Sequence, residues 1–238
     1  MRSIDLDAEK KFENSKFLNE GVRGVQRKYY WATELSTQEH REQTYSVIKG
    51  LYGLEIGCSS GAEAIQYARY CKDYVGIDIS DEAIDVAQGK KIPNCKFICT
   101  DGHKLPFEDR SLDFVIVNSL LHHLDLNVTF QEISRVLTSG GKLIFREPLG
   151  TNPFFQIYRG LTPSARTPDE RPFTIEDVKL MKTYFKFDEI RYFGLLVIIS
   201  AFIKSEKLRK FLKRSDDVMS KTPLKHFFWQ FSGVATKI

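Results

Sequence analysis

Short apolar runs alternate with amphipathic segments between Leu51 and Glu147. Runs rich in β-branched residues predict buried strands, and apolar residues three and four positions apart predict helices. The predicted strands are residues 51–56, 74–77, 95–99, 114–117 and 142–145. The predicted helices between them are residues 62–70, 81–88 and 130–137, the last ended by Ser139-Gly140-Gly141. Repeated strand–helix units of this length favour parallel pairing and right-handed crossovers, which indicates an α/β protein with a doubly wound sheet.

The segments that flank this core complete the expected architecture. Residues 1–48 are predicted to form an N-terminal helical cap, with an aromatic cluster at Tyr29-Tyr30-Trp31. Residues 49–238 are expected to form one domain with helices on both faces of the sheet. Within that domain, residues 150–172 contain four of the eight prolines, which predicts an ordered loop rather than a helix.

The C-terminal part supplies two further strands. Thr174–Asp177 resembles a capping box and predicts a helix that extends to about Phe185. Residues 187–193 and 228–238 are predicted to be strands, which makes a mostly parallel sheet of seven. Between them, residues 194–227 are predicted to form a helical insertion that contains a basic amphipathic stretch.

The charge and the apolar content are those of an ordinary globular protein, except for the charge of the C-terminal part. Hydrophobic residues make up 42% of the chain and charged residues 28%, as in ordinary globular proteins. The longest apolar run, Tyr192 to Ile203, has 12 residues, whereas a membrane span needs about 20. Residues 201–238 hold nine Lys/Arg against three Asp/Glu, a net charge of +6. This excess indicates either a solvated helix face or a surface for an anionic partner.

The cysteines and the N-terminus point to a cytoplasmic protein. Cys58, Cys71, Cys95 and Cys99 contain no Cys-x-x-Cys pair, so no metal site is predicted and reduced thiols are expected. Met1 to Lys11 is charged and lacks the apolar stretch of a signal peptide.

The candidate chemistry begins at the turn after the first predicted strand. Gly57 and Gly61 allow a sharp turn and a close backbone approach to a ligand. Asp78 ends the second strand 21 residues after Gly57, where an acid can accept hydrogen bonds from ribose hydroxyls. Asp101 follows the third strand, in a position to bind an adenine amino group. Glu55 precedes the turn and would repel phosphates but attract an amine. A nucleoside with a cationic, amine-bearing tail and no phosphate describes S-adenosylmethionine.

These motifs resemble, in order, those of the class I S-adenosylmethionine-dependent methyltransferases, over about 100 residues. Residues 54–61 resemble the glycine motif, residues 76–80 the ribose-binding segment and residues 100–107 the adenine-binding segment. Residues 113–124 and 132–141 resemble the next two signatures. The set is most similar to the small-molecule branch that includes the quinone-biosynthesis C-methyltransferases, which have a Rossmann-like fold.

The resemblance implies roles for particular residues. Glu55 and the backbone of Gly57 to Gly61 would hold the amino-acid tail, Asp78 the ribose, and Asp101 with Gly102 the adenine edge. The expected cofactor-binding residues are Glu55, Gly57, Cys58, Ser59, Gly61, Asp78, Ile79, Asp101, Gly102 and Asn118. Ser59 replaces a usual glycine and fits the turn if its backbone angles are ordinary.

The motifs give less information about the residues that would bind the methyl acceptor. His123 is the candidate general base, needed where the acceptor arrives protonated, although the His122–His123 pair often has a packing role in the family. The helices within residues 8–48 and the loop 150–172 are expected to form a lid, with the aromatic cluster either over the cofactor or packing between helices. A group of charged residues beside the loop suits a polar or anionic acceptor: Arg146, Glu147, Arg159, Arg166, Glu170 and Arg171.

Other functions stay open at this point. The basic residues of 194–214 would allow peripheral membrane contact and a lipid-linked acceptor. A nicotinamide-dependent oxidoreductase is disfavoured by Glu55 and by Ser59 in place of a glycine, and a non-catalytic binding module by the retained Asp78. A nucleic-acid methyltransferase is not expected, because Asn118-Ser119-Leu120-Leu121 lacks the Asn/Asp-Pro-Pro-aromatic motif. The oligomeric state and the acceptor itself are not determined.

Overall fold

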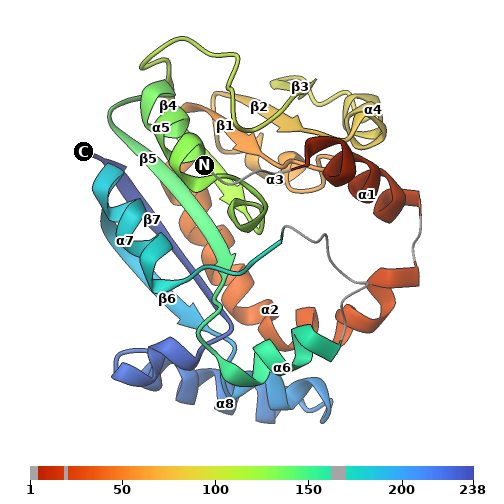
Figure 1. Cartoon of the computed structure of the whole chain (residues 1–238), viewed down its shortest axis with the longest axis vertical. Helices are drawn as coiled ribbons and strands as arrows, with labels where there is room; N and C mark the ends of the chain where they lie inside the picture. The colour runs from red at the N-terminus through yellow and green to blue at the C-terminus, as the bar shows by residue number, and fades with distance from the viewer. Residues whose placement is uncertain (1–4, 19–20, 162–169) are drawn as a thin grey trace.

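A seven-stranded sheet forms the centre of the protein in a computed structural model that describes residues 5–18, 21–161 and 170–238 (Figure 1). The strands lie in the order β3-β2-β1-β4-β5-β7-β6. Their bounds are β1 (Tyr52–Ile56), β2 (Asp73–Asp78), β3 (Cys95–Cys99), β4 (Leu112–Asn118), β5 (Leu137–Pro148), β6 (Phe185–Phe193) and β7 (Gln230–Lys237). The first five pair in parallel, and β7 runs antiparallel between β5 and β6. The predicted doubly wound, mostly parallel sheet is confirmed.

Helices cover both faces of the sheet, as predicted. On one face, α5 (Leu126–Val136) and α7 (Ile175–Tyr184) pack on the strands through buried residues such as Phe130 and Met181. On the other face, α2 (Gly21–Ile48), α3 (Ala64–Tyr67) and α4 (Asp81–Gly89) pack on Ile116 and Phe114. The central strand β4 is therefore apolar on both sides, which is why its sequence shows no alternation.

The remaining helices surround this core. They are α1 (Leu6–Leu18), α6 (Pro153–Leu161), α8 (Glu206–Met219) and the short 3₁₀ helices η1 (Leu121–His123), η3 (Val197–Ala201) and η4 (Pro223–Phe227). The N-terminal segment is helical, as predicted. In Figure 1, α6 and α8 lie at the same end of the molecule.

The prediction of a loop over residues 150–172 is wrong for residues 153–161, which form α6. Pro153 occupies the first position of this helix, where a missing N–H and a fixed φ angle are compatible with helical structure. The Asn152 side chain accepts a hydrogen bond from the Phe155 N–H at 3.4 Å, as a helix cap does. Pro163 and Pro168 lie outside the described residues.

Two predicted helix starts are confirmed, and one strand start is wrong. Ser80 caps α4 by accepting a hydrogen bond from the Ala83 N–H at 3.1 Å. Thr174 and Asp177 form the capping box of α7. In contrast, β5 begins at Leu137 rather than at residue 142, because Leu137 already pairs with Leu112 across an irregular step in the ladder.

Candidate functional site

The turn after β1 is a tight backbone loop held to β2. The N–H groups of Gly57 and Cys58 donate to the carbonyl oxygen of Ile77 at 2.8 and 3.0 Å. Gly57 and Gly61 have φ angles of +78° and +68°, which favour glycine. A Cβ atom on Gly57 would lie 2.8 Å from a methyl carbon of Leu120, so the turn also lacks space for a side chain there.

Ser59, in the same turn, has a φ angle of +47°, so the condition of ordinary backbone angles under which a serine fits here is not met. A left-handed conformation costs a non-glycine residue roughly 1 kcal/mol. In this conformation the Ser59 N–H points at the end of β2 and donates to Oδ2 of Asp78 at 2.8 Å. The hydrogen bond to a carboxylate offsets the backbone strain.

Asp78 connects the turn to the next helix. Its Oδ1 atom accepts a hydrogen bond from the Ser80 N–H at 3.0 Å, while Oδ2 binds Ser59. Burial raises the pKa of Asp78, and the backbone N–H donors act against this shift. The carboxylate is therefore oriented at the carboxyl end of β2, beside Ile79 and the N-terminus of α4.

Glu55 is almost fully buried beneath the turn. Its side chain is 4% exposed and accepts a hydrogen bond from the Tyr74 hydroxyl. Burial raises the pKa of Glu55 to about 8. Cys58 is also buried, and burial raises the pKa of its thiol, which disfavours a nucleophilic thiolate.

Asp101 is held in place by a histidine that the sequence reasoning missed. Its Oδ1 atom lies 2.7 Å from Nδ1 of His103 and 3.0 Å from the His103 backbone N. The Nε2 atom of His103 accepts a hydrogen bond from the Asp125 N–H at 2.9 Å, so Nδ1 carries the proton that faces Asp101. Burial acts to raise the pKa of Asp101, but the bonds from His103 outweigh it and lower the pKa. Gly102 is buried beside them; a Cβ atom there would lie 3.0 Å from Ile56.

Asn118, at the end of β4, is held by two residues from the α2 face of the sheet. Its Oδ1 atom lies 3.0 Å from Nε2 of His40, and its Nδ2 atom donates to the Tyr67 hydroxyl at 3.4 Å. His40 is 1% exposed, and burial, with Arg146 nearby, lowers its pKa to about 3. His40 was not a predicted site residue, although a histidine on the apolar side of a helix was a visible signal.

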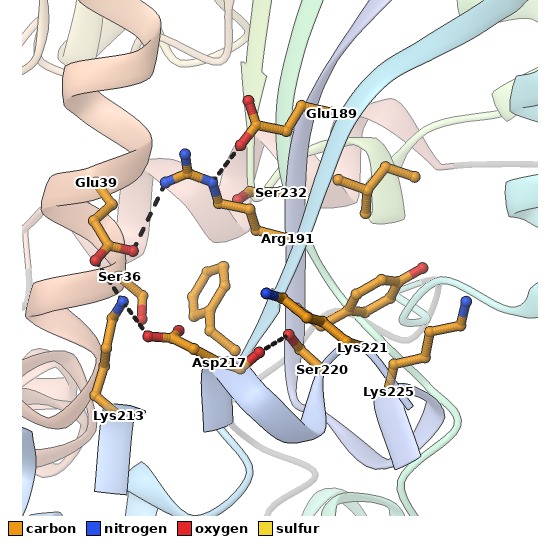
Figure 2. Close-up of a pocket in the computed structure, with 13 residues that line it drawn as sticks. Ser36, Glu39, Glu189, Arg191, Lys213, Asp217, Ser220, Lys221, Lys225 and Ser232 are labelled. Carbon is orange, nitrogen blue, oxygen red and sulfur yellow. Dashed lines mark hydrogen bonds and ion pairs between the residues drawn. The ribbon is translucent and has the colours of Figure 1, made fainter. Parts of the chain in front are cut away.

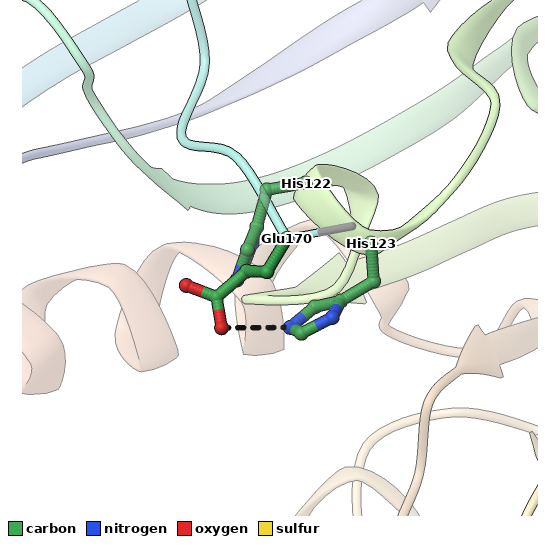
Figure 3. A group of neighbouring side chains, drawn as sticks. All are labelled: His122, His123 and Glu170. Carbon is green, nitrogen blue, oxygen red and sulfur yellow. Dashed lines mark ion pairs between the residues drawn. The ribbon is translucent and has the colours of Figure 1, made fainter. Parts of the chain in front are cut away.

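The histidine pair lies beyond β4, and Glu170, from the segment after α6, faces His123 (Figure 3). The fully buried Glu147 accepts hydrogen bonds from the Leu120 and Leu121 N–H groups and lies 2.7 Å from Nδ1 of His122. This geometry gives His122 a structural role.

His123 faces a carboxylate on each side. Its Nδ1 atom lies 2.9 Å from a carboxylate oxygen of Glu9 in α1, and its Nε2 atom 3.9 Å from one of Glu170. His122, His123 and Glu170 each offer a potential metal-ligand atom, all within 4.8 Å of one another, but Glu170 also pairs with Arg159 at 2.7 Å. Residues of α1 and of the segment after α6 thus meet at His123.

Most of the predicted charged group is paired within the protein. Arg159 pairs with Glu170, Arg171 binds both oxygens of Asp177, and Arg146 donates to Thr37. Arg166 lies outside the described residues. Arg159 and Arg171 therefore give no support to the predicted polar or anionic acceptor, whereas the buried Nε atom of Arg146 has no hydrogen-bond partner among the described residues.

The aromatic cluster of α2 packs against the C-terminal part of the chain. The Tyr29 ring contacts the rings of Phe202 and Trp229 edge-on, and the Arg209 guanidinium lies 4.4 Å from the Trp31 ring. These contacts favour the helix-packing interpretation over a cover for the cofactor.

A separate cavity of about 640 Å³ lies between α2, β6, α8 and η4 (Figure 2). Its lining includes Glu39, Arg191 and Lys213. The side chains of Arg191 and Lys213 both form ion pairs with Glu39. None of the residues that line it is a predicted cofactor-binding residue.

The sheet order, the glycine turn and the acids at the ends of adjacent strands are features of the class I S-adenosylmethionine-dependent methyltransferase fold. Residues 54–145 of the 238 match the model of the methyltransferase domain family, so this stretch is a methyltransferase domain. S-Adenosylmethionine is the cofactor of the class. The helices before and after this stretch lie outside the match.

Curated relatives match the same part of the chain. A demethylmenaquinone methyltransferase of Staphylococcus aureus is 32% identical over 107 residues, which cover 42% of this chain and 44% of that protein. An O-methyltransferase, rstn1, of Aspergillus nomiae is 34% identical over 119 residues, which cover 47% and 52%. The chain thus spans about half the length of these relatives.

Solved structures share the fold. The geranyl diphosphate C-methyltransferase of Streptomyces coelicolor, solved with Mg²⁺, geranyl diphosphate and S-adenosyl-L-homocysteine, has a TM-score of 0.63 at 14% identity. The similarity covers 86% of this chain and 80% of that one. At this identity the likeness establishes the fold alone.

Proposed function

We propose that this protein transfers a methyl group from S-adenosylmethionine to a small-molecule acceptor of lipophilic character. The observation that carries the proposal is the placement of three acids at the carboxyl ends of three adjacent strands. Glu55 is the second-last residue of β1, Asp78 ends β2 and Asp101 follows β3, around the turn of Gly57 to Gly61. A site with acids at these positions suits a cationic nucleoside and opposes a pyrophosphate.

The donor set fits the parts of the cofactor. In this proposal the amine of the tail lies toward Glu55 and the turn, and the ribose hydroxyls donate to Asp78. Ile79 packs on adenine, and Asp101, oriented by His103, accepts from the adenine amino group with Gly102 beside it. Cys58, Ser59 and Asn118 complete the boundary of the site. When bound, the cofactor supplies a methyl group on a sulfonium, which is transferred by in-line displacement and mainly needs positioning.

His123 is the residue we propose as the base for an acceptor that must lose a proton. The Glu9 carboxylate lies near Nδ1, so Nε2 is the ring atom that would accept the proton from the acceptor. The variant His123→Gln is expected to lower kcat while leaving the dissociation constant of S-adenosylmethionine unchanged. A fall in cofactor affinity instead would assign His123 a structural role.

Two observations support a lipophilic acceptor over an anionic one. Arg159 and Arg171 already bind carboxylates within the protein. One relative is named for its action on demethylmenaquinone, a hydrophobic molecule. The acceptor screen should therefore begin with quinols, sterols and polyketide phenols.

Calorimetric titration with S-adenosylmethionine and S-adenosylhomocysteine tests the cofactor assignment. We expect binding to the wild-type protein and a loss of at least about tenfold in Asp78→Ala, because hydrogen bonds to a charged group are removed. Asp73→Ala is the matched control, since Asp73 is exposed at the opposite end of the same strand. Thermal unfolding of both variants separates loss of binding from loss of fold. No binding to the wild-type protein would contradict the proposal and favour a different ligand.

A further inference from the structure

The outer face of α8 carries a stripe of alternating basic and large apolar residues. Lys207, Phe211, Arg214 and Val218 follow one another at spacings of four, three and four residues, so they lie on one side of the helix. Phe211 is 65% exposed and Val218 69% exposed. Single exposed apolar residues are common, but two on a stripe interleaved with cations are a pattern.

The segment before α8 also exposes apolar and basic side chains. Ile199, Phe202 and Ile203 are all about half exposed or more, and the exposed Lys204 follows them directly. Lys28 lies over the Phe202 ring at 4.5 Å and adds a further cation. We define the basic–apolar surface by its members: Ile199, Phe202, Ile203, Lys204, Lys207, Lys210, Phe211, Arg214 and Val218.

We propose that the basic–apolar surface docks this protein on an anionic lipid membrane. A helix with apolar and basic residues on its outer face lies in the plane of the interface, with the apolar groups among acyl chains and the cations at headgroups. The surface has both features, apolar side chains and cations. Nucleic acid would satisfy the cations and leave Phe211, Val218 and Ile203 in water. Among the described helices, none is long and apolar enough to cross a membrane, so the contact would be peripheral.

The opposite face of α8 shows which basic residues take part. Arg209 is 8% exposed and donates to the Trp31 carbonyl at 2.7 Å, and Lys213 pairs with Glu39 and Asp217. These two residues bind the protein itself, so the expectation that they belong to a membrane-facing set is wrong. The exposed basic residues are Lys204, Lys207, Lys210 and Arg214.

The surface is rigidly connected to the fold. The buried carboxylate of Asp216 accepts hydrogen bonds from the Leu195, Leu196 and Val197 N–H groups and so fixes η3 against α8. Arg209 binds α2 at Trp31, and α2 reaches the candidate site through His40 and Asn118. A membrane contact at α8 would therefore hold the candidate site at a fixed orientation to the bilayer.

Vesicle co-sedimentation of the full chain without cofactor tests the proposal independently of methyl transfer. We expect binding to phosphatidylcholine vesicles that contain phosphatidylglycerol, weaker binding to phosphatidylcholine alone, and weakening with salt. The variant K204Q/K207Q/K210Q/R214Q should bind at least about tenfold more weakly, because it removes four cations that would lie near the anionic headgroups. The control K49Q/K72Q/K96Q/K186Q removes the same charge from exposed lysines elsewhere and should bind like the wild type.

A second variant tests the apolar part. F211S/V218S replaces two exposed side chains and should reduce vesicle binding without lowering the melting temperature. Equal binding by wild type and both variants would overturn the proposal, as would equal loss in the control. Sedimentation velocity adds one more outcome: a dimer that F211S/V218S dissociates would make this face a self-association interface and overturn membrane docking.

Discussion

The Nε2 atom of His40, in the N-terminal helix α2, lies 3.0 Å from the side-chain oxygen of Asn118 at the carboxyl end of β4. Both groups lie where the helical cap meets the sheet, and Asn118 in turn contacts Tyr67 of α3. Because the His40 ring is buried and its pKa is lowered to about 3, the ring is neutral at physiological pH and donates one hydrogen bond to Asn118. The cap is thus joined to the candidate site by a buried polar contact.

This contact predicts an acid-dependent loss of stability. In the unfolded chain His40 is protonated below its ordinary pKa of about 6.5, whereas in the folded chain it stays neutral down to about pH 3. The free energy of unfolding therefore falls as pH decreases through this window. Between pH 7 and pH 5 the wild type should lose about 2 kcal/mol more than His40→Gln, which keeps a donor but does not titrate. Urea unfolding at both pH values measures this difference. The exposed His226→Gln should behave like the wild type; an equal pH effect in all three proteins would contradict the prediction.

The strain at Ser59 predicts opposite effects for two substitutions in the same turn. Ser59→Gly removes a left-handed non-glycine residue and should leave the free energy of unfolding unchanged or raise it by up to about 1 kcal/mol, because glycine entropy offsets part of the gain. Gly57→Ala introduces that strain together with a 2.8 Å contact to Leu120. This substitution should lower the free energy of unfolding by about 2 kcal/mol. Denaturant unfolding gives both values. A stabilised Gly57→Ala would show that the turn does not need glycine.

Local patterns were enough to predict the sheet and the ends of several elements. The strand β4 is a continuous apolar run, and Ser80 and Thr174 are cap residues beside their helices. The helix α6 was missed because a count of prolines does not distinguish a proline at the first helical position from one within a helix. The order of the two final strands follows from pairing between distant segments, which no local pattern contains.

In the candidate site, too, some residues could be predicted from local patterns and others could not. Asp78 and the glycines follow strands directly, so their place at one edge of the sheet could be inferred from topology. His40 and Glu9 reach Asn118 and His123 from the N-terminal helices, far along the chain, and their contacts depend on how the cap packs. The backbone angle of Ser59 was also hidden, because it depends on the hydrogen bond between its N–H and Asp78.

The buried Glu147 predicts a large effect away from the cofactor. Its carboxylate accepts hydrogen bonds from two backbone N–H groups and from the His122 ring. The variant Glu147→Ala would therefore leave three polar groups without their acceptor. The free energy of unfolding should fall by about 3–5 kcal/mol. Glu176→Ala is the matched control, because Glu176 is exposed and pairs only with the nearby exposed Lys179 among the described residues. The control should change stability by no more than about 0.5 kcal/mol. Similar values for the two variants would show that Glu147 does not anchor η1.

Glu55 predicts that cofactor binding is linked to proton release. Burial raises its pKa to about 8, so the carboxyl is largely protonated at neutral pH before a ligand binds. An ammonium group placed beside it favours the ionised form, and the proton is released on binding. Affinity should therefore increase as pH approaches about 8, because a growing fraction of the carboxyl is already ionised before the ligand binds. Calorimetry at neutral pH in buffers of different ionisation enthalpy should report close to one proton released by the wild type and fewer by Glu55→Gln, which cannot ionise. Asp73→Ala should release as many protons as the wild type. Equal proton release by wild type and Glu55→Gln would mean that the amine is bound elsewhere in the turn.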